Sequence, residues 1–102
     1  MKFTTTRSFD ADYRNLSESE AGLFREALTS FIPACDRYAA DSSSRWPAAL
    51  RVKDVEGAPG VWEMTWSFSG PDGRATFEFL QIDGSLGVRW RRIGDHSIFK
   101  RP

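Results

Sequence analysis

Three stretches of the C-terminal part of the chain decide the fold, because each has the composition of a β-strand. They read Gly60-Val61-Trp62-Glu63-Met64-Thr65-Trp66, Asp72-Gly73-Arg74-Ala75-Thr76-Phe77 and Trp90-Arg91-Arg92-Ile93-Gly94-Asp95-His96-Ser97-Ile98-Phe99. From the first stretch on to Phe68, the apolar residues Trp62, Met64, Trp66 and Phe68 alternate with polar ones, which is typical of a half-buried strand.

Turn signals separate these strands. Ser69-Gly70-Pro71-Asp72-Gly73 precedes a predicted strand over 74–82, and Asp83-Gly84 precedes another over 86–93. A further strand is expected over 50–55, before the turn at 57–60. Consecutive strands joined by short turns are antiparallel, so the pattern predicts an antiparallel meander.

The N-terminal half predicts an edge strand over 3–6 and a short helix over 8–16. Ser17-Glu18-Ser19-Glu20 is a capping box that opens a second helix. Its apolar stripe of Phe24, Leu28, Phe31 and Cys35 should pack on the sheet. Pro33 is expected to end or kink this helix, and 36–49 to form a loop or frayed helix.

The chain of 102 residues fits one domain, 1–102. The order of its elements predicts an α+β fold, with an N-terminal strand and a helical pair packed on one face of a twisted antiparallel sheet. The other face is expected to be partly open and to hold any site.

Charge and cysteine content restrict the function. The formal net charge is zero, which argues against a non-specific nucleic-acid binder. Residues 89–102, however, hold five basic residues against Asp95 alone, a local charge of +4. The single cysteine, Cys35, excludes an internal disulfide and is consistent with a cytoplasmic location. There is no apolar run long enough to span a membrane and no signal-peptide pattern at the start.

The order of elements and several local strings resemble the RelE/ParE superfamily of toxins from bacterial type II toxin–antitoxin systems. The strings are Arg51-Val52-Lys53, Gly60-Val61-Trp62-Glu63, Gly73-Arg74-Ala75-Thr76-Phe77 and Arg92-Ile93-Gly94-Asp95-His96-Ser97-Ile98-Phe99. The likeness covers nearly the whole chain, with 36–49 matching least.

The resemblance to the RelE-like branch implies a metal-independent mRNA endonuclease that acts on the ribosome, inhibits translation and is held inactive by an antitoxin. Its implied site residues are the catalytic His96, Arg74, Arg91 and Arg92, together with the RNA-binding Arg51, Lys53 and Arg89. Phe99 stands where many relatives have a Tyr, and a phenyl ring has no hydroxyl to move a proton. The ParE branch shares the fold but inhibits DNA gyrase without cutting RNA, so the fold leaves both activities open.

His96 is the only histidine, and histidine is the side chain best suited to proton transfer near neutral pH. The guanidinium of Arg74 could stabilise the charge of a five-coordinate phosphorus. Alternatively, His96 hydrogen-bonds Asp95 or the backbone at the sheet end, and Arg74 is an exposed strand residue paired with Glu63 or Glu78. The functional interpretation requires Arg74 and His96 on one side of the sheet, within reach of one phosphate.

Alternation places Arg89 and Arg91 on one face of the last strand and Arg92 on the other with Trp90. Packing of Leu86, Val88 and Trp90 on the helices favours Arg89 and Arg91 at the open face, whereas the family string allows either Arg91 or Arg92.

Arg51 and Lys53 share a face of their predicted strand and would suit an RNA backbone, with plain solvent exposure as the alternative. Trp46 is the one tryptophan expected to be exposed enough to stack on a base. No metal-ligand spacing and no phosphate-binding glycine loop is present, so no cofactor is predicted.

Overall fold

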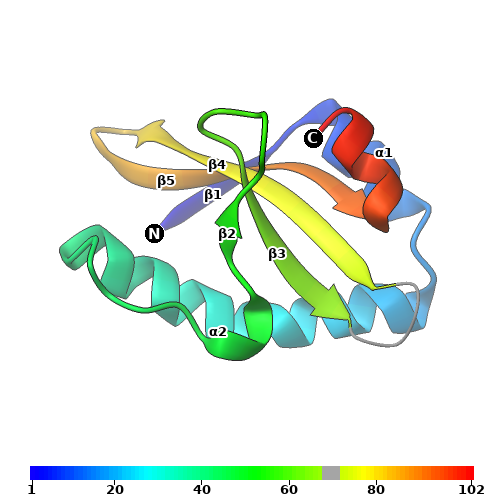
Figure 1. Cartoon of the computed structure of the whole chain (residues 1–102), viewed down its shortest axis with the longest axis horizontal. Helices are drawn as coiled ribbons and strands as arrows, with labels where there is room; N and C mark the ends of the chain where they lie inside the picture. Colours follow the sequence, from blue (N-terminus) through cyan, green and yellow to red (C-terminus); the bar gives the residue numbers. More distant parts are fainter. Residues whose placement is uncertain (68–71) are drawn as a thin grey trace.

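The computed structural model describes residues 1–67 and 72–102, and its centre is a five-stranded sheet (Figure 1). The strands are β1 (Lys2–Thr5), β2 (Lys53–Asp54), β3 (Trp62–Ser67), β4 (Gly73–Ile82) and β5 (Ser85–Gly94). The helices are α1 (Arg7–Arg14) and α2 (Glu18–Ala40), and two short 3-10 helices are η1 (Ala48–Leu50) and η2 (His96–Lys100). The strand order is β1-β5-β4-β3-β2.

The predicted meander is confirmed, because β2–β3, β3–β4 and β4–β5 are all antiparallel pairs. Asp83 and Gly84 both have positive φ, 52° and 83°, as a two-residue hairpin turn that follows the strand twist requires. Phe68 and the predicted turn at 69–71 lie outside the described residues.

The sheet is mixed rather than wholly antiparallel. β1 pairs in parallel with β5, with Phe3 opposite Val88. Two helices and three strands lie between β1 and β5 in the sequence, so the connection is long enough to bring the chain back in the same direction. The α+β class and the helical pair on the sheet are as predicted.

The capping box of α2 is formed as predicted: Ser17 Oγ accepts from the Glu20 amide at 3.1 Å, and Glu20 Oε1 accepts from the Ser17 amide at 2.8 Å. Pro33 was expected to end or kink this helix. It does not end it, because α2 continues to Ala40. Pro33 is exposed, whereas Ala34 and Cys35 beside it are buried. Packing of the buried side therefore holds the helix together past the missing backbone donor.

The core lies between α2 and the sheet and is rich in aromatic rings. Phe31 is fully buried, with ring centroids 5.0 Å from Trp90 and 5.1 Å from Phe77. The predicted stripe is confirmed, since Phe24, Phe31 and Cys35 are buried and Leu28 packs against them. Trp46 is not an exposed stacking residue: its ring stacks on Phe31 and lies partly buried.

The predicted strand over 50–55 is shorter than expected. Residues 48–50 form η1, and Arg51 then adopts a left-handed conformation with φ 47°. Only Lys53 and Asp54 pair with β3. Arg51 and Lys53 therefore do not share the face of one strand, because the backbone turns between them.

The face of the sheet opposite α2 is covered at one end, where Arg74 and Thr76 are buried, while Arg89 and Arg91 remain partly exposed. Figure 1 shows the chain after β5 folding back beside α1 as η2. Ile98 of η2 is buried against Gly94, and Thr76 of β4 is completely buried under the last residues. The apolar Ile98 explains the covering, since its burial removes a large side chain from water.

Candidate functional site

The arginine-rich end of β5 is shaped by a β-bulge. Thr76 of β4 lies opposite Arg92 and Phe77 lies opposite Trp90, so Arg91 is the extra residue. Because of this insertion Trp90 and Ile93, three positions apart, are both buried in the core. Strict alternation would have put them on opposite faces. The bulge therefore leaves both Arg91 and Arg92 outside the core.

Glu78 of β4 bridges two arginines of β5. Its carboxylate accepts from Arg89 Nη2 at 3.1 Å and from Arg91 Nη1 at 2.6 Å. Partial burial by itself would raise the pKa of Glu78, but the hydrogen bonds and positive charge of Arg91 and Arg89 outweigh it and hold the pKa below its ordinary value. Arg89 and Arg91 thus share a face, as the alternation favoured.

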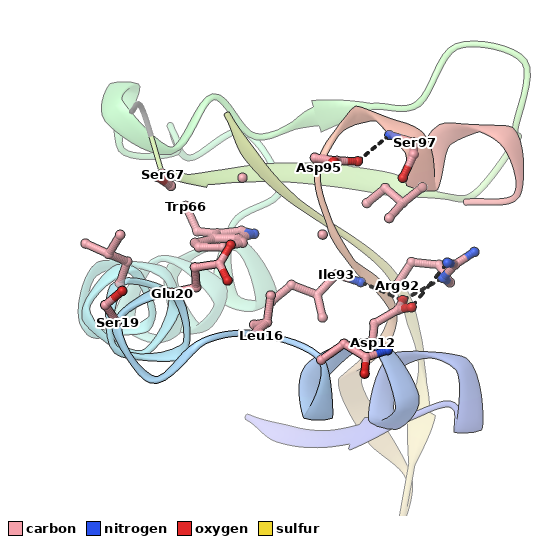
Figure 2. A pocket seen from close by; sticks show the side chains of 15 residues that line it. Asp12, Leu16, Ser19, Glu20, Trp66, Ser67, Arg92, Ile93, Asp95 and Ser97 are labelled. Carbon is pink, nitrogen blue, oxygen red and sulfur yellow. Dashed lines mark hydrogen bonds and ion pairs between the residues drawn. The ribbon is translucent and has the colours of Figure 1, made fainter. Parts of the chain in front are cut away.

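Arg92 points elsewhere and joins β5 to α1. Asp12 of α1 accepts from Arg92 Nε at 2.6 Å and from Nη2 at 3.2 Å, and also from the Ile93 amide (Figure 2). The hydrogen bond to Asp12 raises the pKa of Arg92 above its ordinary value. This fork-shaped pair fixes the guanidinium at the edge of the bulge.

The C-terminal residues contact the same bulge. Arg91 Nε donates to the main-chain oxygen of Pro102 at 3.0 Å, and Arg92 Nη1 donates to that of Arg101 at 3.2 Å. Thr76 Oγ1 lies 3.5 Å from the Pro102 oxygen. A cavity of about 630 Å³ lies beside the bulge, and its volume is enough for a small ligand. It is lined by Arg91, Arg92, Arg101, Asp12 and the start of α1.

Arg74 is buried, with 7% of its surface exposed, so it is not the exposed strand residue of the alternative interpretation. It donates to the Gly73 carbonyl at 3.3 Å and to Asp72 at 3.4 Å, and its Nε lies 4.0 Å from Glu63. Glu63 also faces Lys53 at 3.9 Å. Of the two expected carboxylate partners of Arg74, Glu63 is near it and Glu78 is engaged by Arg89 and Arg91.

His96 is exposed at the start of η2, and its ring lies edge-on to Phe99 with centroids 5.6 Å apart. Asp95 caps η2 by accepting from the Ser97 amide at 2.8 Å. Hydrogen bonding from the side chain of Ser97, and then from its amide, lowers the pKa of Asp95. In the β4–β5 pair Arg74 lies opposite Gly94, and His96 follows Gly94 by two residues. Arg74 and His96 therefore belong to the same end of the sheet. A joint contact of both side chains with one phosphate stays a prediction.

A second cavity has a volume of about 420 Å³. Figure 2 shows its lining side chains, which come from the α1–α2 connection and the ends of β3 and β5. Trp66 forms one wall, with Glu20 beside it, and Asp95 and Ser97 lie across from them. The cavity adjoins the Asp12–Arg92 pair, so the bulge lies between two hollows.

Asp12, Thr76 and the Pro102 main-chain oxygen were not singled out from the sequence. Thr76 could have been found, because it is two residues from both Arg74 and Glu78 and must share their face. Asp12 carried no local signal, since its partner is 80 residues away.

Within residues 1–67 and 72–102, no group of three or more His, Cys, Asp or Glu side chains is placed to hold a metal ion. In the same residues, neither helix combines the length and the apolar character needed to cross a membrane.

No protein-family model matches the chain, and no curated protein matches its sequence. Among solved structures, the chain superposes on a YoeB/ParE toxin from Agrobacterium tumefaciens with a TM-score of 0.59, covering 94% of this chain and 99% of that chain. The chain has the fold of that toxin. Sequence identity is 12%, so the likeness concerns the fold, and the fold expected from the RelE/ParE resemblance is confirmed.

Proposed function

We propose that this chain is the toxin of a type II toxin–antitoxin system and an endonuclease that cuts mRNA on the ribosome. The observation that carries the proposal is the superposition on a YoeB/ParE toxin over 94% of the chain. Its binding partners would be a cognate antitoxin and mRNA, and its place of action the cytoplasm.

We expect the arginines of β5 to supply part of the chemistry that RNA cleavage needs. Arg89 and Arg91 are partly exposed and share a single carboxylate, so this pair keeps one unbalanced positive charge toward solvent. Such a pair can bind the RNA backbone and stabilise charge on the reacting phosphorus. Arg92 would hold the bulge in place through Asp12, which makes it a positioning residue as well as a possible phosphate ligand.

His96 is the residue proposed to transfer the proton. The 2′-hydroxyl of the RNA attacks the neighbouring phosphorus and loses its proton, while the departing 5′-oxygen gains one. An exposed imidazole at this end of the sheet can perform one of these transfers. Arg74, being buried, would act on the phosphate only through its neighbours Glu63 and Asp72, and Lys53 and Arg51 would bind RNA farther from the reaction.

The alternative is a non-catalytic protein on the same fold, a ParE-like gyrase inhibitor or an antitoxin-binding protein. One observation favours it: Arg74, Arg89, Arg91 and Arg92 all have a carboxylate within 4.0 Å. In addition, Phe99 provides no hydroxyl next to His96.

Controlled expression in a bacterium tests the two functions together. The nuclease proposal expects growth arrest with fragmented mRNA. Purified protein that has been stripped of metal with a chelator, and then freed of the chelator, should cut mRNA on ribosomes and leave a 2′,3′-cyclic phosphate. His96→Ala should slow cleavage by roughly 10²-fold while the protein stays folded. Growth arrest with intact mRNA and broken DNA would instead establish the gyrase alternative.

A further inference from the structure

Trp66 of β3 carries a hydrogen-bond donor that the protein leaves unused. Only 5% of its surface is exposed, and within residues 1–67 and 72–102 its indole Nε1 is buried without an acceptor. Figure 2 shows this nitrogen at the end of the ring that faces the other side chains of the second cavity. A buried donor without a partner is rare, because it has lost its hydrogen bond to water and gained no other. The unused N–H therefore indicates an acceptor that a bound molecule supplies.

Two carboxylates of the same cavity have no positive charge paired with them. Glu20 and Asp95 both line it, and none of the ion pairs in the described part of the chain involves either residue. The third carboxylate of the lining, Asp12, is paired with Arg92. The cavity is therefore negatively charged and would repel the phosphates of RNA, whereas an organic cation fits it.

Apolar side chains form much of the remaining wall. Leu16, Leu23 and Ile98 line the cavity together with Trp66. Leu23 is a large apolar side chain with 40% of its surface exposed. Such a wall suits a cation on an alkyl stem better than a bare metal ion. In keeping with this, the described residues include no group of three or more side chains placed to hold a metal.

We propose that the second cavity binds an arginine, with the guanidinium between Glu20 and Asp95 and a carbonyl oxygen of the same molecule on the indole N–H of Trp66. The alkyl stem covers Leu16 and Leu23. A guanidinium suits two carboxylates better than an ammonium does, because its planar fork presents five donors in fixed directions. The volume of about 420 Å³ lies within the range of ligand pockets, about 300–1,000 Å³. This inference is independent of the proposed nuclease function.

NMR titration of the full chain with N-acetyl-arginine N-methylamide tests the proposal. The indole N–H signal of Trp66 is assigned through the contact of its ring with Gly73, and it should move downfield when the carbonyl accepts from it. The signal of Trp46, whose ring stacks on Phe31 outside the cavity, should stay in place. Binding without a change at Trp66 would put the ligand elsewhere, and an absence of binding would refute the site.

Two analogues separate the roles of the cation and the acceptor. N-acetyl-citrulline N-methylamide has nearly the same shape without the charge, and it should bind about tenfold more weakly or worse. Butylguanidinium has the charge and the stem without a carbonyl, so it should leave the Trp66 signal where it is. Equal affinity of the arginine and citrulline compounds would overturn the inference, and so would an equal downfield shift with butylguanidinium.

Glu20→Gln tests the cavity itself and should weaken binding of the arginine compound several-fold. Glutamine also serves at this position of a capping box, so the start of α2 is kept. Glu18→Gln is the matched control, since Glu18 is an exposed carboxylate of the same helical turn that does not line the cavity. Equal losses in the two variants would show general attraction to an acidic surface and would refute the site. The comparison of ligands needs no variant, so it stands even if Glu20→Gln fails to fold.

The source of the arginine is identified by a second titration, with the free amino acid. Tighter binding of the blocked compound would support the site and assign it to an arginine within a partner polypeptide. Tighter binding of free arginine would support the site and assign it to the amino acid. None of these measurements involves RNA, so a failure of arginine binding leaves the nuclease proposal untouched, and intact mRNA leaves the arginine site untouched.

Discussion

The carboxylate of Glu78 lies 2.6 Å from Arg91 Nη1, and its second oxygen lies 3.1 Å from Arg89 Nη2. One acidic side chain thus holds two arginines of the neighbouring strand in fixed positions across the β4–β5 pair. The basic set that the sequence singled out is therefore an ordered ion-pair cluster rather than a group of independent surface cations.

Glu78→Gln should lower the free energy of unfolding by about 1 kcal/mol at pH 7, a value already reduced for the partial exposure of both arginines. The pKa of Glu78 is lower in the folded chain than its ordinary 4.5, so its contribution is complete above that value and is lost as the pH falls below it. Urea unfolding at pH 7 and pH 3 measures this, with exposed Glu56→Gln as the control. An equal difference between wild type and variant at both pH values would contradict the assignment.

Arg74→Ala should destabilise the protein by about 2 kcal/mol, because it leaves Glu63 and Asp72 near a buried, unoccupied space. Urea unfolding at pH 7 measures the loss, and Arg74→Lys, which keeps the charge, should recover part of it. If Arg74→Ala has wild-type stability and only loses activity, the role of Arg74 is chemical rather than structural.

Gly73→Ala and Gly22→Ala should change stability in opposite directions. A Cβ at Gly73 would lie well inside van der Waals contact with the ring of Trp66, so we expect a loss of about 1–3 kcal/mol. A Cβ at Gly22 in α2 meets only Arg25 Nη2, at 3.8 Å, and alanine favours the helix by about 0.5–1 kcal/mol. Thermal unfolding of both variants checks this, and a neutral Gly73→Ala would show that Trp66 moves freely.

Cys35 should not react with thiol reagents in the native protein at pH 8. Burial, together with the nearby charge of Asp36, raises the pKa of its thiol to about 12, so almost no thiolate is present. Absorbance with a disulfide reagent should show no reaction over an hour and one equivalent after unfolding in guanidinium. Complete reaction of the folded protein within minutes would mean that α2 opens readily.

The local features of the fold were predictable from the sequence because each depends on neighbouring residues. The Ser17–Glu20 capping box, the Asp83-Gly84 turn and the helical spacing of Phe24, Phe31 and Cys35 can be recognised within a few residues. Pro33 was misjudged because helix propensity is a local property, whereas the burial of Ala34 and Cys35 against the sheet is not.

The sequence by itself determined the α+β class, the antiparallel meander and the gathering of positive charge over 89–102. Only the tertiary structure decided how those charges are used, because hydrogen bonds depend on register and on contacts between distant segments. The bulge at Arg91 directs Arg92 to Asp12, 80 residues away, and the burial of Ile98 brings the Pro102 oxygen onto Arg91. No pattern of nearby residues encodes such pairings, since each forms only after the sheet and α1 have packed.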